Sequence, residues 1–393
     1  MHHSKNRERL IEACQGALIV ITGHETMQLS GDMAAPFLQD ANFWWLTGIE
    51  EPGWRAIIDG SRGKTILVRP ALTEVQQVFD GSISDEHALT ISGASSVIAT
   101  KQFDEELIQL ARSHTLVMTA SNKQDGMHVN PAQHKLANQL ERIFNKLEYC
   151  DKHLTELRAI KQPAEIEFIK NAVKVSVDAY AHIHEKWDKY KYEYEVEADF
   201  TYEFNKRGHA HAYAPIVASG QRGCTLHYDK NNQRISKREC TVIDIGARVN
   251  GYASDITRTY CSNPTKRQRQ VHKAVQQAQG RIVALLGPDL TIMEYIKGVD
   301  DIMKEAIMSL GLMENKDDQS NYRKYFPHAV SHGLGVDVHD SLASPRYFRP
   351  GMVLTVEPGI YIPEEGIGVR IEDDILINSN GNVNLSAALS TDL

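Results

Sequence analysis

Short apolar runs recur along the first part of the chain, separated by polar segments. Residues 17–22 and 115–119 are apolar runs of strand length and predict two strands. Residues 54–58 and 64–68 flank a glycine-rich turn and predict a hairpin.

A helical pattern follows these strands. Asn130-Pro131 is typical of a helix N-cap followed by proline at the first helical position. The apolar positions that follow at helical spacing are Leu136, Leu140, Ile143 and Leu147. Strands alternating with helices predict an α/β domain of about 150 residues.

The pattern changes after Arg158, where long amphipathic helices and strand-rich segments dominate. Pro163 opens a helix whose apolar face consists of Ile166, Ile169, Val173, Val177 and Tyr180. A second helix has Val271, Val275, Ala278, Ile282 and Leu285 on one face. Thr291 and Glu294 form a capping box before a third, with apolar positions Ile292, Tyr295, Val299, Ile302, Met303 and Leu310. Helices combined with hairpins predict an α+β fold for this part.

Length and composition limit the class of protein. A chain of 393 residues exceeds what one core usually serves, so we expect two domains, residues 1–155 and 156–393. No apolar run reaches about 18 residues and the N-terminus lacks an apolar signal segment, so neither a membrane span nor secretion is expected. Five scattered cysteines favour a reduced, cytoplasmic protein. A net charge of −8 argues against nucleic acid as a partner.

The segment 241–259 predicts a hairpin with two carboxylates on one face. Asn250-Gly251 is the preferred pair for a two-residue type I′ turn. Without a bulge, Asp244 lies opposite Thr257, and Asp255 shares the face of Thr257. Two adjacent carboxylates repel each other unless a cation lies between them, which favours a divalent metal site. The alternative is that both are exposed on a half-solvated strand, and a bulge would break the alternation.

A histidine-rich segment and two acidic strands supply further candidates. His328, His332 and His339 lie within twelve positions, interleaved with glycines. Glu357 and Glu372 each lie in an otherwise apolar strand, where an unpaired carboxylate is costly to bury. In the second strand Arg370, Glu372 and Asp374 share one face. The glutamates are therefore partners of an arginine such as Arg370, or metal ligands.

In this order and with these flanks, five residues resemble the ligands of the pita-bread metallopeptidases, which include methionine aminopeptidases, prolidases and aminopeptidase P. They are Asp244, Asp255, His332, Glu357 and Glu372. The flanking motifs are most similar to those of aminopeptidase P and prolidase. Residues 39–48 resemble a motif of the aminopeptidase P N-terminal domain, which methionine aminopeptidases lack. The resemblance covers the whole chain and implies a C-terminal pita-bread fold behind an N-terminal α/β creatinase-like domain.

The resemblance implies an aminopeptidase that removes the N-terminal residue from peptides with proline in second position. The reaction would use a hydroxide bridged between two divalent metal ions, with manganese favoured by the oxygen-rich ligand set and cobalt, zinc and iron as alternatives. Asp255 and Glu372 would bridge the metals, and Glu357 would also be the general base. His328 and His339 would contact the substrate and the oxyanion, and His227 would bind the peptide.

The resemblance also implies that Arg370 orients one of the aspartate ligands. The chain departs from the bacterial pattern at Gly333, which often is a bulky aromatic, and in the short stretch 362–368. Both are expected to alter the wall of the substrate pocket. We further expect a homo-oligomer, either a dimer or a tetramer.

Two alternatives remain open from the sequence. A prolidase would accept only Xaa-Pro dipeptides. A catalytically silent relative would bind peptides or proteins without hydrolysis, although such relatives are expected to have lost ligands.

Overall fold

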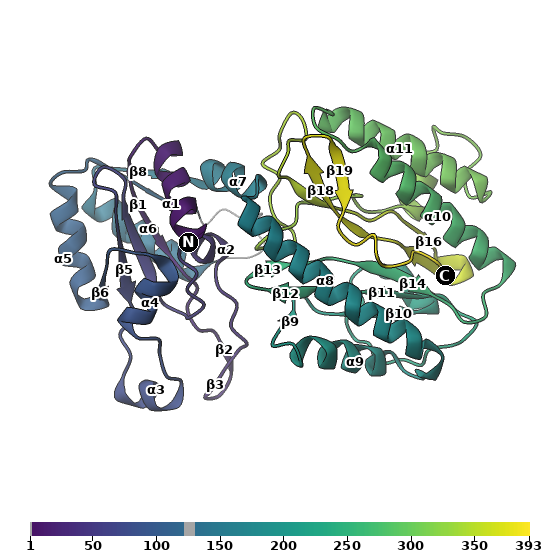
Figure 1. The fold of residues 1–393 in the computed structure, drawn as a ribbon, viewed down its shortest axis with the longest axis horizontal. Coiled ribbons are helices and arrows are strands. Elements are labelled where there is room, and N and C mark those ends of the chain that lie inside the picture. Colours follow the sequence, from purple (N-terminus) through teal and green to yellow (C-terminus); the bar gives the residue numbers. More distant parts are fainter. Residues whose placement is uncertain (1, 122–129) are drawn as a thin grey trace. The chain divides into compact units, whose positions relative to one another are not determined.

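The computed structural model describes residues 2–121 and 130–393 and divides into two compact units, Met1–Leu157 and Arg158–Leu393 (Figure 1). No helix among these residues is long and apolar enough to cross a bilayer.

The first unit is built on a mixed six-stranded sheet in the order β6-β5-β4-β1-β7-β8. Its strands are β1 (Leu18–Thr22), β4 (Arg55–Asp59), β5 (Lys64–Arg69), β6 (Ser96–Ala99), β7 (Leu116–Thr119) and β8 (Lys146–Tyr149). β4 and β5 pair antiparallel with Ile57 opposite Ile66, which confirms the predicted hairpin. β1 is buried along its whole length, which fits its run of four apolar residues before Thr22.

This unit also contains helices and a small hairpin, and α3 (Glu74–Phe79) lies away from the sheet at the end of long connections (Figure 1). The helices are α1 (His2–Ala13), α2 (Ala41–Thr47), α3 (Glu74–Phe79), α4 (Asp85–Ser92), α5 (Thr100–Ala111), α6 (Pro131–Ile143) and α7 (Asp151–Ala159). The short strands β2 (Gln28–Ser30) and β3 (Met33–Ala34) pair with each other. Asn130 caps α6 through its side chain, as predicted.

One position of the predicted helix is wrong. The helix ends at Ile143, and Leu147 lies in β8, opposite Val117 of β7. Phe144 adopts extended backbone and ends the helix. Pairing with β7 therefore determines the conformation of Leu147, although its spacing fits a helix.

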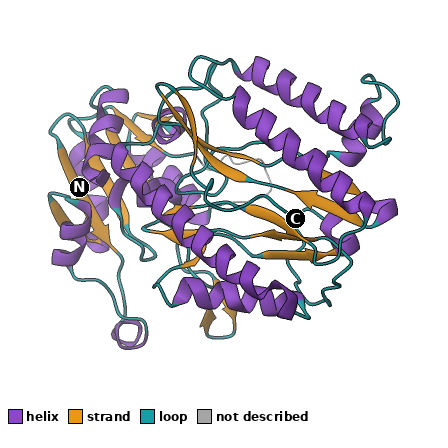
Figure 2. Ribbon diagram, turned by 45° about the vertical axis from the view of Figure 1, so that its right-hand side comes forward, coloured by secondary structure: helices purple, strands orange, loops and turns teal. Residues whose placement is uncertain are grey.

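In the second unit, strands lie between two pairs of helices (Figures 1 and 2). The strands are β9 (Ala210–His211), β10 (Ile216–Ser219), β11 (Thr241–Asp244), β12 (Ala247–Val249), β13 (Tyr252–Ala253), β14 (Thr257–Tyr260), β15 (Val353–Val356), β16 (Gly359–Ile362), β17 (Ile367–Arg370), β18 (Asp373–Asn378) and β19 (Gly381–Asn384). The sheets are β10-β11-β14, β13-β12-β9, β15-β18-β19 and the pair β16-β17.

The three predicted helices of this unit are present. They are α8 (Pro163–Lys186), α10 (Lys266–Leu285) and α11 (Ile292–Ser309), and the capping box at Thr291 is formed. This unit also contains elements that were not predicted from the sequence, namely α9 (Glu193–Asn205), α12 (Gln319–Tyr325) and the 3₁₀ turns η1 (Trp187–Lys189), η2 (Gly220–Cys224) and η3 (Pro363–Glu365).

Helix α8 holds the β11–β14 hairpin in place. The hydroxyl of Tyr180 donates to the carbonyls of Ile243, at 3.0 Å, and Ile256, at 2.6 Å. These residues directly precede Asp244 and directly follow Asp255. A buried aromatic on the helix therefore fixes the backbone on both sides of the paired carboxylates.

Candidate metal centre

The hairpin brings Asp244 and Asp255 together as its register predicts. Val249 pairs with Tyr252, and Asp244 pairs with Thr257. Asn250 and Gly251 have φ values of 48° and 78°, as a type I′ turn requires. The intervening residues keep one register, so both carboxylates lie on the same face.

Tyr213 joins the two carboxylates. Its hydroxyl lies 2.6 Å from Oδ1 of Asp244 and 2.6 Å from Oδ1 of Asp255. Burial, followed by the charges of these aspartates, raises the pKa of Tyr213 far above its usual value, so the phenol keeps its proton. Tyr213 was not predicted from sequence, because it lies in a loop outside every motif considered.

His332 points its Nε2 at the carboxylates. That nitrogen lies 3.4 Å from Oδ2 of Asp255 and 3.5 Å from Oε1 of Glu357. Its Nδ1 lies 3.0 Å from the carbonyl of Gly333, which assigns the Nδ1–H tautomer and directs the Nε2 lone pair inward. Burial opposes protonation, but hydrogen bonding and charge from Asp255 raise the pKa of His332 to about 9 in the metal-free site. A cation bound there would take the place of the proton on Nε2.

Glu372 completes the closest group. Its carboxylate accepts a hydrogen bond of 2.6 Å from Oγ1 of Thr257, directly opposite Asp244. Ligand atoms of Asp255, His332 and Glu372 all lie within 4.8 Å of one another. Four carboxylates and one imidazole therefore face one another in the second unit.

The charges of this cluster are not balanced by the protein alone. Burial raises the pKa of Asp244 and that of Glu372, and neighbouring carboxylates add to the effect. Burial likewise raises the pKa of Glu357 to about 7. Oδ1 of Asp374 is buried without a hydrogen-bond partner among the described residues. Such a cluster either holds protons or holds cations, and its oxygen-rich donor set fits divalent metal ions.

Arg370 is the principal cation that touches the cluster. Its guanidinium donates to Oδ2 of Asp244 at 2.6 Å, to Oγ1 of Thr257 at 3.3 Å and to the hydroxyl of Tyr361 at 3.0 Å. Asp374 lies on the same side, where its Oδ2 accepts the backbone N–H of Asp255 at 3.1 Å. Arg370, Glu372 and Asp374 thus point into the site as predicted, but the single strand predicted for them is interrupted, because β17 ends at Arg370 and β18 begins at Asp373. The strand predicted around Glu357 is also interrupted, since this residue lies between β15 and β16.

The other two histidines of this segment lie at the edge of the carboxylate cluster, which we call its rim. Nε2 of His328 is 2.9 Å from the hydroxyl of Tyr361, and its Nδ1 is 3.6 Å from Oε2 of Glu357. The rings of His339 and His332 meet edge to face with centroids 4.2 Å apart. Burial lowers the pKa of His328 to about 4 and lowers that of His339.

His227 is exposed, but it belongs to the same rim. Its charge contributes to the lowered pKa of both His328 and His339 after burial and nearer charges. Its loop is anchored by the buried carboxylate of Glu193 at the start of α9. That carboxylate accepts hydrogen bonds from the N–H groups of Ser219 and Gln233, both at 2.9 Å, and from the hydroxyl of Tyr228 at 2.8 Å. Glu193 was not predicted, since nothing local in the sequence marks it as buried.

The fold and the cluster together define a metal-dependent peptidase. Residues 167–379 match Metallopeptidase family M24, and residues 3–118 match the aminopeptidase P N-terminal domain. The chain belongs to metallopeptidase family M24.

Relatives extend this match along the whole chain. The chain is 33% identical over 397 residues to Xaa-Pro aminopeptidase 3 of Homo sapiens, covering 94% of this chain and 78% of that protein. It is 32% identical over 416 residues to Xaa-Pro aminopeptidase of Escherichia coli, covering 98% and 94%. Aminopeptidase P from E. coli with the inhibitor Pro-Leu superposes with a TM-score of 0.90 at 29% identity, covering 100% and 95%. These matches confirm the predicted pita-bread fold and creatinase-like N-terminal domain.

Proposed function

We propose that the protein is an Xaa-Pro aminopeptidase, which removes the N-terminal residue from peptides with proline in second position. This proposal rests on one observation, which is that two family models match different parts of the same chain. A catalytic unit of family M24 follows an aminopeptidase P N-terminal domain. Relatives called Xaa-Pro aminopeptidases cover 94% and 98% of the chain, which supports the same activity.

The proposed ligands are the five residues of the cluster. Asp244 would bind one metal, Asp255 and Glu372 would bind both, and His332 and Glu357 would complete the set. The convergence of these side chains and the uncompensated carboxylates support the assignment. Two divalent cations held here would acidify a water molecule and polarise the peptide carbonyl.

Side chains of the protein would carry out proton transfer and substrate binding in the proposed reaction. Glu357 would take the proton of the attacking water on a carboxylate oxygen and pass it to the leaving nitrogen of proline. His328 and His339, whose lowered pKa values favour neutral rings, would hydrogen-bond the substrate and its developing oxyanion. His227 would hold the peptide at the rim, and Arg370 would keep Asp244 oriented.

Manganese is the proposed metal. Four carboxylates and one imidazole form a hard, oxygen-rich donor set, which suits manganese better than thiolate-preferring metals. A cytoplasmic location is also part of the proposal, and the five free thiols of the chain support it.

One set of assays decides between this function and its alternatives. The manganese-loaded protein is offered an Xaa-Pro dipeptide, a longer Xaa-Pro-Yaa peptide and a peptide without proline. We expect cleavage of the longer Xaa-Pro peptide and none of the control. Cleavage of the dipeptide alone would instead identify a prolidase. Metal binding without any hydrolysis would identify a silent relative.

A further inference from the structure

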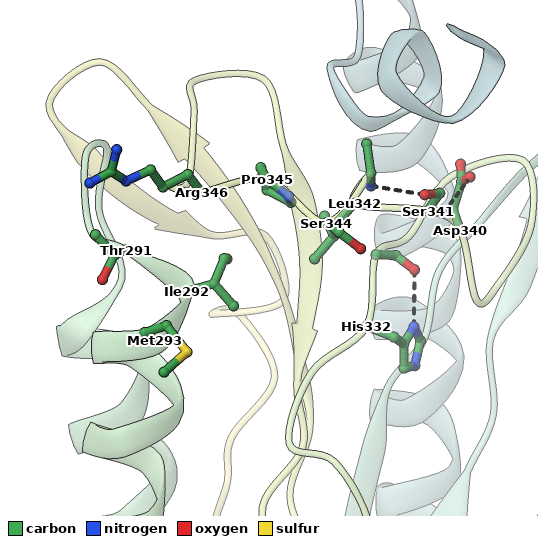
Figure 3. Close-up of a pocket in the computed structure, with 12 residues that line it drawn as sticks. Thr291, Ile292, Met293, His332, Asp340, Ser341, Leu342, Ser344, Pro345 and Arg346 are labelled. Carbon is green, nitrogen blue, oxygen red and sulfur yellow. Dashed lines mark hydrogen bonds between the residues drawn. The ribbon is translucent and has the colours of Figure 1, made fainter. Parts of the chain in front are cut away.

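Two cysteines that the proposed peptidase does not use lie at the open end of the metal-binding hairpin. The cavity of about 780 Å³ beside His332 adjoins the carboxylate cluster and is part of the site proposed above (Figure 3). Cys240, in contrast, directly precedes β11, and Cys261 directly follows β14. Both side chains belong to the buried apolar core of the second unit. The hairpin therefore carries its carboxylates between the Asn250-Gly251 turn and a pair of thiols.

The register of β11 and β14 places the two cysteines opposite each other. Thr241 pairs with Tyr260, so the next position outward brings Cys240 opposite Cys261. The two segments stay side by side beyond this position, because the N–H of Asn263 donates to the carbonyl of Lys237 at 2.7 Å. The backbone on both sides of the cysteine pair is therefore held by hydrogen bonds.

The pair also lies at the kind of position where a disulfide can form between strands. Hydrogen-bonded and non-hydrogen-bonded pairs alternate along antiparallel strands, and the N–H of Ile245 donates to the carbonyl of Ile256 at 3.1 Å. Cys240 and Cys261 lie five positions outward from that hydrogen-bonded pair, so they form a non-hydrogen-bonded pair. In such pairs the Cα atoms are about 4.5 Å apart and the side chains are closest. That spacing falls within the range of about 4.4–6.8 Å that disulfides require.

The two thiols contact each other and differ in proton affinity. Their hydrogen bond, followed by burial, raises the pKa of Cys240 far above its usual value. The same hydrogen bond lowers the pKa of Cys261 against the effect of burial, with help from the N–H of Asn263 and the charge of Arg269. The S–H of Cys261 donates to the carbonyl of Lys237 at 3.6 Å. Cys261 is therefore the sulfur that becomes a thiolate, and Cys240 keeps its proton and donates to it.

Access from solvent favours the same sulfur. Cys261 is 5% exposed and Cys240 is 1% exposed, and the neighbouring residues 237–239 and 263 are exposed, so the pair lies just beneath the surface. The other three cysteines of the chain, all in its described parts, have pKa values raised by burial; they are Cys14, Cys150 and Cys224. Cys261 therefore combines a lowered pKa with a second thiol in contact, which is the arrangement of an oxidisable pair.

We propose that Cys240 and Cys261 are a modification site, at which a hydroperoxide converts two thiols reversibly into a disulfide between the ends of β11 and β14. The thiolate of Cys261 attacks a peroxide oxygen, the O–O bond breaks, and the leaving alkoxide or hydroxide takes up a proton. The sulfur of Cys240 then loses its proton and attacks the sulfenic acid of Cys261, the S–O bond breaks, and water leaves. Two electrons thus pass from the sulfurs to the peroxide. A dithiol reductant restores both thiols by exchange and is itself oxidised to a disulfide.

The disulfide closes the segment that carries Asp244 and Asp255 into a covalent loop. A cross-link of this kind stabilises the folded state mainly by restricting the unfolded chain. The carbonyl of Cys240 also accepts the N–H of Gly220 at 2.8 Å, so the cross-link holds the start of η2 together with both strands. The oxidised protein should therefore unfold at a Tm roughly 5–10 °C higher than the reduced protein. Peroxide thus tightens the metal-binding hairpin.

Peptide mapping of the full chain tests the site. The purified protein is treated with hydrogen peroxide, free thiols are alkylated, and the digest is analysed by mass spectrometry without reductant. We expect the peptides of Cys240 and Cys261 as a single linked species that separates after dithiothreitol, while the other three cysteines are alkylated. Separate alkylation of both residues after peroxide, or a link to any other cysteine, would overturn the inference.

Single variants test the order of the two steps. Cys240→Ser removes the second thiol, so Cys261 should accumulate as a sulfenic acid that dimedone labels, and peroxide should not raise Tm. Cys261→Ser should leave Cys240 unlabelled. Cys224→Ser, outside the pair, is the control and should keep both the linked species and the rise in Tm. Labelling of Cys240 in Cys261→Ser, or a wild-type Tm that oxidation leaves unchanged, would contradict the proposal. These measurements are independent of peptidase activity, so their failure leaves the proposed function intact.

Discussion

Glu357 occupies a position between two histidines that no other carboxylate of the cluster shares. Its oxygens lie 3.5 Å from Nε2 of His332 and 3.6 Å from Nδ1 of His328. Glu357→Gln keeps the volume but removes the proton acceptor and weakens one ligand. We expect kcat to fall at least about a hundredfold, the usual contribution of general-base catalysis. Steady-state kinetics with measured metal content checks this, and a kcat near the wild-type value would assign proton transfer elsewhere.

The three histidines of the segment 328–339 should differ in function, with one acting as a metal ligand and two acting on the substrate. His332 directs Nε2 at two carboxylates, so His332→Ala should lower metal content together with activity. His328→Ala and His339→Ala should retain metal and lose about a hundredfold or more in kcat/KM, comparable to losing an oxyanion donor. Elemental analysis of the purified variants is the measurement. An empty site in either rim variant beside a filled one in His332→Ala would reverse the assignment.

At the scale of single residues, the sequence predicts those site residues that belong to a recognisable local pattern, such as a turn or a strand. The turn at Asn250-Gly251 defines the register that pairs Asp244 with Thr257. Strand alternation predicts that Asp374 faces the site. Tyr213 and Glu193 could not be predicted, because their role depends on contacts across the fold rather than on local pattern.

Among the elements, η2 and β17 approach each other closely and so join the loop of His227 to the strand of Arg370. A Cβ on Gly368 would overlap the backbone carbonyl of Gly223. Gly368→Ala must therefore displace one of the two segments, at a cost of about 1–3 kcal/mol in unfolding free energy.

Urea unfolding measures this loss for Gly368→Ala. Gly280→Ala is a matched control, because a Cβ there meets no atom within 4 Å and helix α10 favours alanine. Equal stability of both variants would show that the two segments separate freely.

Elements with long periodic faces are predictable, and elements that depend on distant partners are not. α8, α10 and α11 each bury a regular apolar stripe, and the structure confirms them. α9 also buries Val196, Phe200 and Phe204 at every fourth position, so a signal was present but is diluted by acidic and tyrosine residues. Leu147 fits a helix by spacing, yet its pairing with β7 places it in a strand.

For the molecule as a whole, bound metal should contribute to stability as well as activity. Removing it leaves buried carboxylates that repel one another, so a chelator should abolish activity and lower Tm. Manganese should restore both, since binding to the folded state alone stabilises it by mass action. Full activity in protein shown to be metal-free by elemental analysis would contradict the proposed mechanism.

We expect copies of the molecule to associate through an exposed apolar face of helix α3. Val75, Val78 and Phe79 are 64%, 82% and 81% exposed and lie on one face of this short helix. Exposed apolar patches of this kind mark interaction sites. We expect a dimer or tetramer by light scattering, and a smaller species for Val78→Asp with Phe79→Asp. Gln77→Asp on the same helix is the control, and an unchanged mass in the double variant would exclude this face.

The hairpin also restricts how the length of the chain can vary between its aspartates. Because side chains alternate along a strand, inserting one residue in the arm between Asp244 and the Asn250-Gly251 turn would rotate one carboxylate to the opposite face. Insertions in that arm are tolerated only in pairs, or when a bulge absorbs the odd residue. The interval between the two aspartates is therefore constrained by whether the number of inserted residues is even or odd, and less by how long the insertion is.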